Sequence, residues 1–397
     1  MAQTKIQPDM EFVRELQEAG GETLKKCYQC ATCSVACPVA PANSPYPRKE
    51  MIWASWGMKD KLTKDIDLWL CHNCGNCADL CPRGARPADL MSAARNMVYR
   101  SLTEPTIVGK WMSSAKGLPY LFAIPAVLWL VIWWIRSWFN DGQWFPRAED
   151  GRIVFGQVFY GDYTIDPIFM ITFFGAAYIL YRGTMRLLAL FKPEGTVLML
   201  GKTKPWYLHL YDVIVEEIIT HKKFSNCSVK NDDTVQTETK SSRKWGHMVL
   251  MYSFVALAIV TAIVAGGHWV GKVIPMLKVE TPLALTNPIK ILANMGALAM
   301  VFGLGLLTIR RIKLNPKYQA SSFYDWYLLG IIWVVALTGI LSQAFRLMDA
   351  ITPAFIVYYF HLVFVWMLFA YLPWSKLGHF VYRTAALTYV RMVGRNN

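Results

Sequence analysis

The order of hydrophobic and polar positions divides the chain into two parts. Residues 1–110 mix polar and apolar positions, and residues 90–98 repeat apolar side chains at helical spacing. Most of residues 118–374, in contrast, belongs to long apolar runs that are rich in Trp, Phe and Leu. This pattern predicts a mainly α-helical protein with a compact N-terminal domain over residues 1–110 and a membrane domain over residues 111–397.

Six apolar segments are each about long enough to cross the hydrocarbon core of a bilayer, which takes ~20 helical residues. The second segment is interrupted by Arg182 and Arg186, whose long side chains can extend to the nearer interface. The predicted spans lie near residues 118–138, 168–190, 247–270, 288–309, 326–346 and 354–374.

The distribution of charge predicts the orientation of these spans. The chain carries 41 basic and 27 acidic side chains, which give a formal net charge of +14. Lys and Arg gather in connection 191–245, in connection 310–325 and in the C-terminal tail, whereas connection 139–167 has two arginines against five acidic residues. Because a basic excess marks the cytoplasmic side, we expect loop 191–245 and both termini in the cytoplasm. Membrane topology thus accounts for the charge, and no nucleic-acid binding is expected.

The N-terminal sequence also bears on location. MAQTKIQPDMEFVREL lacks the basic region and apolar stretch of a secretory signal. We therefore expect the cysteine-rich N-terminal domain to stay in a reducing compartment, where thiols favour metals over disulfides. Sixteen tryptophans suit the aromatic belts of a membrane protein. The expected location is the cytoplasmic (inner) membrane, with several passes.

Eight of the nine cysteines form two copies of the motif C-x2-C-x2-C-x3-C-P. A C-x2-C-x2-C loop can hold three corners of a [4Fe-4S] cluster, and in two-cluster ferredoxins the fourth cysteine of each run ligates the other cluster. We therefore predict two [4Fe-4S] clusters that exchange their fourth ligands. The predicted ligands are Cys27, Cys30, Cys33 and Cys81 for cluster 1, and Cys71, Cys74, Cys77 and Cys37 for cluster 2.

Structural zinc is the competing interpretation, because paired C-x2-C motifs also bind zinc. Zinc, however, has no requirement for the third cysteine of each loop or for the proline that follows. The ninth cysteine, Cys227, lies alone in a polar stretch and is expected to have no cofactor role.

Four of the seven histidines lie near the ends of the third and sixth predicted spans, which run antiparallel. His247 and His379 fall on the cytoplasmic side, and His268 and His361 on the outer side. Two imidazole pairs at two depths are what two b-type haems require, and an ionisable residue inside a membrane is a functional candidate by default. We predict axial ligation of one haem by His247 and His379, and of the other by His268 and His361.

Helical spacing fits one helix better than the other. His361 and His379 are 18 residues apart and share a face, whereas His247 and His268 are 21 apart and about 60° out of phase. A bend at 266–267, which are both glycine, could absorb this difference.

The other histidines are expected not to bind haem. His209 and His221 lie in the amphipathic part of connection 191–245. His72 lies inside the second cysteine motif, where it could tune a cluster by hydrogen bonding, although a partly exposed side chain is expected. Trp269 and Tyr358 are expected to be belt residues.

These motifs resemble known families. The cysteine-rich half is similar to the heterodisulfide reductase C subunits, and the membrane half resembles cytochrome b proteins related to the gamma chain of respiratory nitrate reductase. The fusion of the two, with the tail LPWSKLGHFVYR, resembles the C subunits of the quinone-interacting membrane-bound oxidoreductases of sulfate reducers. The fold class implied is a helical two-cluster ferredoxin-type domain followed by a six-helix transmembrane cytochrome b-type bundle.

The resemblance implies cofactors and partners. It implies two [4Fe-4S] clusters, two haems b, menaquinone as exchangeable substrate, flavin-containing heterodisulfide reductase A-like subunits and adenylylsulfate reductase. The expected function is electron transfer between the menaquinone pool and these cytoplasmic partners in dissimilatory sulfur metabolism. The chain has no Cys-Cys pair, the feature of the catalytic subunits, so no sulfur-substrate site is expected in it. No catalytic residue and no quinone contact is assigned.

Two alternatives stay open. The chain could be the membrane arm of a heterodisulfide-reductase-like or sulfite-reductase-linked complex with a different terminal acceptor. A transporter with a zinc-binding regulatory domain is the alternative from another class, and it predicts zinc and no visible haem. Repeated ionisable groups in the middle of the spans would favour the transporter, and the sequence has few.

Overall fold

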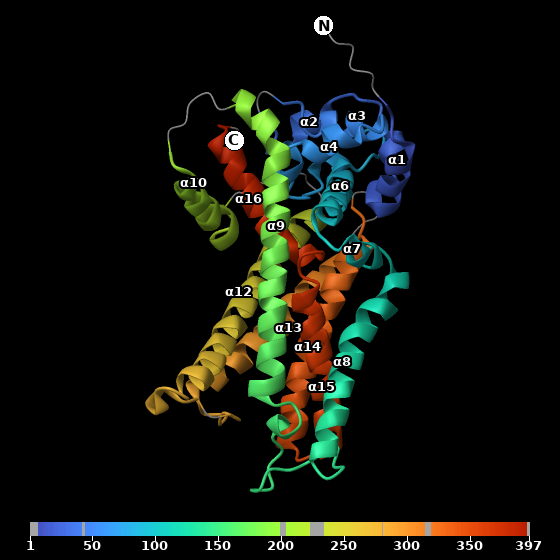
Figure 1. The fold of residues 1–397 in the computed structure, drawn as a ribbon. Coiled ribbons are helices and arrows are strands. Elements are labelled where there is room, and N and C mark those ends of the chain that lie inside the picture. Colours follow the sequence, from blue (N-terminus) through green and yellow to red (C-terminus); the bar gives the residue numbers. More distant parts are fainter. Residues whose placement is uncertain are drawn as a thin grey trace.

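The computed structural model describes residues 7–41, 44–198, 204–222, 234–279, 281–313 and 319–394. The molecule is 73% helical, and the described residues contain no β-strand. This confirms the predicted mainly α class. Figure 1 shows two layers, with a group of short helices at one end and a bundle of long helices below it.

Short helices form the N-terminal layer. α1 begins where the sequence provides a cap, because the Asp9 side chain accepts a hydrogen bond of 2.8 Å from the Phe12 amide. α6 carries the apolar repeat around residues 90–98 and buries that face. The helices of this layer are α1 (Met10–Leu16), α2 (Thr32–Ala36), α3 (Arg48–Ser55), α4 (Lys59–Lys64), α5 (Asn76–Asp79), α6 (Pro87–Leu102) and α7 (Thr106–Trp111).

Six helices in the described residues are long and apolar enough to cross a membrane. They are α8 (Leu118–Phe139), α9 (Asp166–Leu198), α12 (Thr234–Val270), α13 (Pro288–Ile312), α14 (Phe323–Leu347) and α15 (Ile351–Ala370). Each overlaps one predicted span. The last helix ends at Ala370, before the predicted limit of 374, because Pro373 disfavours helical backbone in the residue that precedes it.

Two further helices lie outside the bundle. α10 (Trp206–Val213) continues into a π-helical segment, Ile214–Ile219, within the connection 191–245. α16 (His379–Met392) follows α15 after a short turn and lies against α9 and α10. Figure 1 places α16 and α1 at the same end of the bundle.

The long helices pack in pairs, α12 along α13 and α14 along α15. Small residues on α13 permit the first pairing. A Cβ atom added at Gly303 would lie 2.9 Å from the Leu250 amide nitrogen of α12, so only glycine permits this approach. α15 also contacts α8 and α9, which places it inside the bundle.

One hydrophobic core joins the two layers. α9 extends beyond the bundle and buries Leu187 and Phe191 among residues of the N-terminal layer, with the Phe191 ring 6.5 Å from that of Trp69. Tyr382 and Val390 of α16 belong to the same core. The predicted boundary near residue 110 is thus crossed by shared packing, which fixes the N-terminal layer against the helices.

The two arginines of the second predicted span have separate partners. Arg186 forms an ion pair of 2.8 Å with Glu104 and donates a hydrogen bond of 3.1 Å to the Leu102 carbonyl. Arg182 donates to the Tyr178 hydroxyl, one turn earlier, at 3.2 Å. Both charges thus meet polar atoms rather than apolar side chains alone.

Candidate metal centres

Two cavities in the N-terminal layer are each lined by four cysteines. Cys27, Cys30, Cys33 and Cys81, here called the first cysteine set, line one cavity. Cys37, Cys71, Cys74 and Cys77, the second cysteine set, line the other. The structure therefore brings together the same two groups of four that the sequence predicts, including the exchange of Cys37 and Cys81 between the motifs.

The two motifs share one backbone conformation. The residue two places after the first cysteine has a positive φ in both, 68° at Gln29 and 52° at Asn73. The residue just after the second cysteine also has a positive φ, 70° at Ala31 and 89° at Gly75. A short helix, α2 or α5, begins directly afterwards. Left-handed backbone costs energy for residues other than glycine, so its repetition indicates a loop shaped around its sulfur atoms.

Hydrogen bonds already reach several sulfur atoms. The Asn73 amide donates to Cys71 Sγ and the Ala85 amide donates to Cys81 Sγ, each at 3.3 Å. The Gln29 side chain donates to Cys27 Sγ at 3.4 Å. N–H groups aimed at sulfur stabilise the thiolate and tune the potential of an iron–sulfur cluster.

Burial governs the acidity of these thiols. It raises the pKa of Cys33 to about 11, of Cys37 to about 12, and of Cys77 well above its ordinary value. At exposed Cys30, a hydrogen bond with the Thr32 hydroxyl lowers the pKa. Cys33, Cys37 and Cys77 therefore keep their protons at neutral pH until a cation displaces them. Four soft sulfur donors around one cavity fit an iron–sulfur cluster.

The two sets differ in exposure. In the first set Cys30 is exposed, and the nearby side chains of Tyr28 and Val35 are 57% and 89% exposed. In the second set Cys71 and Cys77 are buried. The cysteines of the first set are therefore closer to solvent than those of the second.

His72 corrects one expectation from the sequence. It is buried, at 7% exposure, rather than partly exposed. Arg383 of α16 donates through Nη2 to His72 Nδ1 at 2.9 Å, which explains the burial: the imidazole lies where the N-terminal layer meets α16.

His379 has the orientation of a metal ligand. Its Nδ1 lies 2.6 Å from the Lys376 carbonyl oxygen, which can only accept, so Nδ1 carries the proton and Nε2 keeps its lone pair. Histidines that bind metals commonly donate their other ring N–H in this way. Burial, with a contribution from nearby His247, lowers the pKa of His379 to about 3, so the ring is neutral at physiological pH.

His247 has a neighbour that the sequence did not predict. His221 Nε2 lies 3.1 Å from His247 Nδ1. Three histidines, from α12, α16 and connection 191–245, therefore gather at the end of the bundle next to the N-terminal layer. The expectation that His361 and His379 share one helix face is wrong, because α15 ends at Ala370 and His379 begins α16 after a turn. His209 lies half-buried on α10. Cys227 lies outside the described residues.

His361 is held by α14. Its Nδ1 lies 3.0 Å from the Thr338 hydroxyl, which itself donates to the Val334 carbonyl and can therefore accept from the imidazole. A Cβ atom added at Gly339 would lie 3.0 Å from His361 Cε1, so glycine provides room for the ring. As in His379, Nδ1 is engaged and Nε2 is the remaining nitrogen.

His268 differs from the other predicted ligands. It lies at the end of α12, is 38% exposed in its side chain, and contacts Asp162 through Nε2. Lys272 pairs with the same carboxylate at 2.8 Å. Among the described residues, His268 and His361 thus have separate hydrogen-bond partners. The expected belt residues lie nearby: Trp269 donates to Asp166 at 2.9 Å, and Tyr358 stacks on Phe155.

Comparison with known proteins agrees with this division into two parts. Residues 23–85 match the model of a 4Fe-4S dicluster domain, and residues 205–396 match that of Citrate utilization protein B. The first match covers both cysteine sets and supports 4Fe-4S binding by the N-terminal layer. The second covers α10 and the helices from α12 onward. No solved structure matches the chain.

Curated relatives match the N-terminal part. The C subunit of the H(2):CoB-CoM heterodisulfide,ferredoxin reductase of Methanothermobacter marburgensis is 38% identical over 89 residues, which are 22% of this chain and 48% of the relative. The iron-sulfur C subunit of the CoB--CoM heterodisulfide reductase of Methanopyrus kandleri is 36% identical over 101 residues, 24% of this chain and 53% of the relative. The chain thus spans about half the length of these relatives.

The matches and the fold define the class of the chain. It combines an N-terminal 4Fe-4S domain with six candidate membrane-spanning helices. More narrowly, its N-terminal domain is similar to the C subunits of heterodisulfide reductases, and its C-terminal region is similar to Citrate utilization protein B.

Proposed function

We propose that the chain is the membrane electron-transfer component of an oxidoreductase complex. It would exchange electrons between the menaquinone pool and cytoplasmic flavin- and iron–sulfur-containing subunits. The observation that carries the proposal is the arrangement of two four-cysteine cavities against a helical bundle whose nearest end holds His247 and His379. Iron–sulfur clusters and haems supply one-electron chemistry when bound, while the protein supplies position and tuning.

Each cysteine set would hold one [4Fe-4S] cluster. The sulfur-only donor sets, the repeated loop conformation and the amide N–H groups on Cys71 and Cys81 support this assignment. The match of residues 23–85 to a 4Fe-4S dicluster domain supports it independently.

Two haems b would lie between the helices that carry the four histidines. His247 with His379 would be the axial pair near the N-terminal layer, and His268 with His361 the pair near the far end. The proton on Nδ1 of His379 and the contact of His361 Nδ1 with Thr338 support ligation through Nε2. The support for His268 is its sequence position alone, because its Nε2 contacts Asp162.

A histidine substitution tests the haem assignment. His361→Ala should remove one of two haem signals from the reduced-minus-oxidised visible spectrum and leave the iron–sulfur signals in place. The control is Thr172→Ala, which removes a hydroxyl that donates to the Ile168 carbonyl on another helix of the bundle. An unchanged haem content in His361→Ala would contradict the assignment.

Charge and the fold support one membrane orientation. Lys and Arg gather in connections 191–245 and 310–325, and their described parts, α10 and the end of α13, lie on the side of the N-terminal layer, as do α1 and α16. We propose that this end faces the cytoplasm, in the cytoplasmic (inner) membrane. The cysteine sets would then meet soluble cytoplasmic partners.

The partners are proposed to be flavin-containing heterodisulfide reductase A-like subunits, with adenylylsulfate reductase as the terminal acceptor. This rests on the resemblance of the fused chain to the C subunits of quinone-interacting oxidoreductases. The membrane arm of a heterodisulfide-reductase-like complex is the second candidate, because the matched relatives are named as C subunits of heterodisulfide reductases. Co-purified proteins distinguish the two, since only the first candidate predicts adenylylsulfate reductase.

A cofactor assay tests the proposed function as a whole. The purified full chain should give a reduced-minus-oxidised spectrum of b-type haem, with iron and acid-labile sulfide in the proportion of two [4Fe-4S] clusters. A colourless sample that contains zinc and no iron would overturn the proposal and favour the transporter alternative.

A further inference from the structure

The loop from Cys71 to Cys74 is held by three different elements. Arg95 of α6 donates to the Cys71 carbonyl at 2.8 Å. Arg383 of α16 donates to His72, and Gln319, which precedes α14, donates to the Asn73 carbonyl at 3.2 Å. Two of the three holding residues thus belong to the part of the chain that contains the candidate spans. The loop of the second cysteine set is therefore a direct contact between the two layers.

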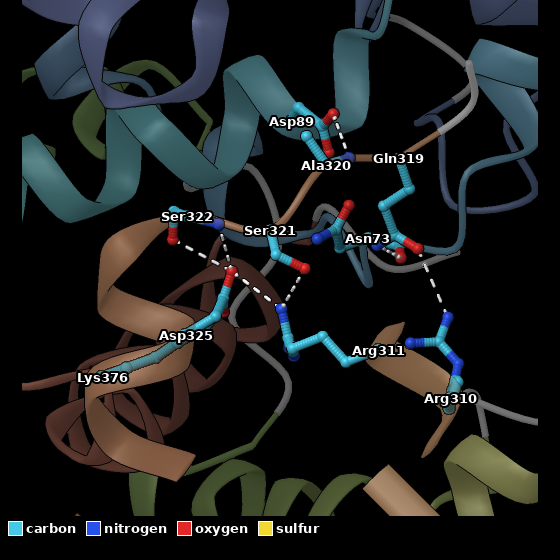
Figure 2. A network of polar contacts seen from close by, with 10 residues as sticks. All are labelled: Asn73, Asp89, Arg310, Arg311, Gln319, Ala320, Ser321, Ser322, Asp325 and Lys376. Atoms are coloured by element: carbon cyan, nitrogen blue, oxygen red, sulfur yellow. Dashed lines mark hydrogen bonds and ion pairs between the residues drawn. The ribbon is translucent and has the colours of Figure 1, made fainter. Parts of the chain in front are cut away.

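Figure 2 shows how the contact continues into the bundle. Gln319 accepts a hydrogen bond of 3.3 Å from Arg310, at the end of α13, while the Ala320 amide donates to Asp89 of α6 at 2.9 Å. The segment 319–322 is therefore bonded to both layers at once. Gln319 thus connects Asn73 in the N-terminal layer with Arg310 of α13 through two hydrogen bonds (Figure 2).

The same network reaches the turn that holds His379. Asp325 of α14 pairs with Arg311 at 3.1 Å and with Lys376, and the Lys376 carbonyl accepts the Nδ1 proton of His379. Lys376 and Asp325 are drawn together in Figure 2.

α16 makes a second and shorter link. Arg383 follows His379 by four residues, so the two side chains share one face of the helix. From that face Arg383 reaches His72, which is next to Cys71 in the chain. One helical turn, the hydrogen bond from Arg383 to His72 and the chain link from His72 to Cys71 thus connect the candidate haem ligand with the second cysteine set.

The first cysteine set has a different environment. The hydrogen bonds at its sulfur atoms involve Gln29, Thr32 and Ala85, which all belong to the N-terminal layer, and Cys30 is exposed. Its exposed neighbours Tyr28 and Val35 present apolar surface to solvent. The second set therefore contacts the part of the chain that contains the membrane helices, and the first set faces solvent. This difference indicates the order in which electrons would pass through the two sets.

We propose that electrons cross between the membrane helices and the N-terminal layer at the second cysteine set, with Arg383 and Gln319 as positioning residues that hold the Cys71–Cys74 loop against the helices. This inference rests on the proposed function. The first cysteine set is then the site nearer to solvent, where a soluble partner exchanges electrons with the chain. Electron transfer falls steeply with distance, so a loop fixed by hydrogen bonds from both α16 and the segment before α14 keeps the separation short and constant.

The test uses the purified full chain with its cofactors. Arg383→Gln and Gln319→Ala remove the two contacts, Arg383→Lys restores a donor, and Arg391→Gln is the matched control. Arg391 lies on the same helix but pairs with Glu216 at 2.6 Å, away from the cysteine loops. Electron paramagnetic resonance distinguishes the two cluster signals, and Cys74→Ser identifies the signal of the second set.

In Arg383→Gln and Gln319→Ala, iron, sulfide and haem contents should stay unchanged. The signal and the reduction potential of the second cluster should shift. Electron transfer between this cluster and the haem, measured by freeze-quenching, should slow on the order of ten-fold, the lower end of the effect of removing a hydrogen bond that orients a metal ligand. The signal of the first cluster should not move. Arg383→Lys should recover part of the rate, and Arg391→Gln should behave like the unaltered protein.

The outcomes separate this inference from the proposed function. If the unaltered chain lacks iron and haem, both are overturned. If its cofactors are present but neither variant alters the second-cluster signal or the transfer rate, the inference alone is overturned. A change confined to the first-cluster signal would also overturn it, because it would place the crossing at the other set. Gln319→Ala removes two hydrogen bonds, with Asn73 and with Arg310, and leaves α16 untouched, so it remains informative if Arg383→Gln does not fold.

Discussion

The first and second cysteine sets have the same backbone conformation but different surroundings. In both, positive φ angles at equivalent positions precede a short helix. The first set lies at the surface with Cys30 exposed, whereas the loop of the second set is held by α6, α16 and the segment before α14. This difference shows that the cysteine motif determines the backbone conformation of each loop. Residues distant in the sequence determine which of the two loops faces the membrane helices.

The largest expected difference between the sets is in thiol reactivity. In iron-free protein, iodoacetamide should modify Cys30 first, because it is exposed and its pKa is lowered by the hydrogen bond with Thr32. Cys77 should react last, because burial excludes the reagent and raises its pKa. Peptide mapping by mass spectrometry at successive times measures the order. Equal rates at the two cysteines would mean that the sets do not differ in burial.

A substitution in the polar network between the two layers, here called the joint (Asp89, Arg311, Gln319, Asp325 and Lys376), should have a large effect on stability. Asp325→Ala leaves Lys376 and Arg311 without their shared carboxylate, and breaking a largely buried ion pair costs about 3 kcal/mol of unfolding free energy. Thermal unfolding in detergent, followed by circular dichroism, measures the loss. Asp60→Ala is the control, because Asp60 pairs with Lys64 at an exposed site and should leave the midpoint unchanged. Equal midpoints for the two variants would contradict a structural role of the joint.

Equivalent loop positions provide a smaller, paired test. Gly75→Ala should destabilise the second loop by about 1 kcal/mol, because φ is 89° there and a side chain at positive φ is strained. Ala31→Gly, at the matching position of the first loop, should change stability less, since relief of strain is offset by greater freedom of the unfolded chain. Thermal loss of cluster absorbance measures both. A larger effect at position 31 would argue against a shared loop conformation.

The smallest expected effect is a dependence on pH at the joint. Burial raises the pKa of Asp89 to about 6 from an ordinary value of 3.8. The folded protein then binds this proton more tightly than the unfolded chain, so the stability contributed by Asp89 should fall as pH rises from 3.8 to 6. Asp89→Asn should remove this component of the slope. Identical slopes in thermal unfolding of the two proteins between these pH values would contradict it.

Sequence patterns predicted the local features well. The six apolar runs predicted the long helices, and motif spacing predicted which four cysteines gather at each cavity. Both depend on information held within a few tens of residues: helical length in one case, and the reach of a short loop in the other. The predicted exchange of Cys37 and Cys81 came from the pattern of two-cluster ferredoxins, in which the fourth cysteine of each run ligates the other cluster.

Contacts between distant segments were not predictable in this way. Arg383 and His72 are 311 positions apart, and Gln319 and Asn73 are 246 apart. No periodicity indicates such pairs, because they depend on how one layer rests on the other. The same reason explains why His72 was expected to be partly exposed, and why the contact of His221 with His247 was not foreseen.

Stopped-flow reduction of the purified full chain by a menaquinol analogue tests the central claim most directly. Haem absorbance should change first, and bleaching of the iron–sulfur absorbance should follow. His379→Ala should preserve the iron–sulfur content and prevent this bleaching, while a soluble reductant should still reduce the clusters from the exposed side of Cys30. Bleaching by the quinol at an unchanged rate in His379→Ala would contradict an electron path from the membrane helices through the end of α16 to the second cysteine set.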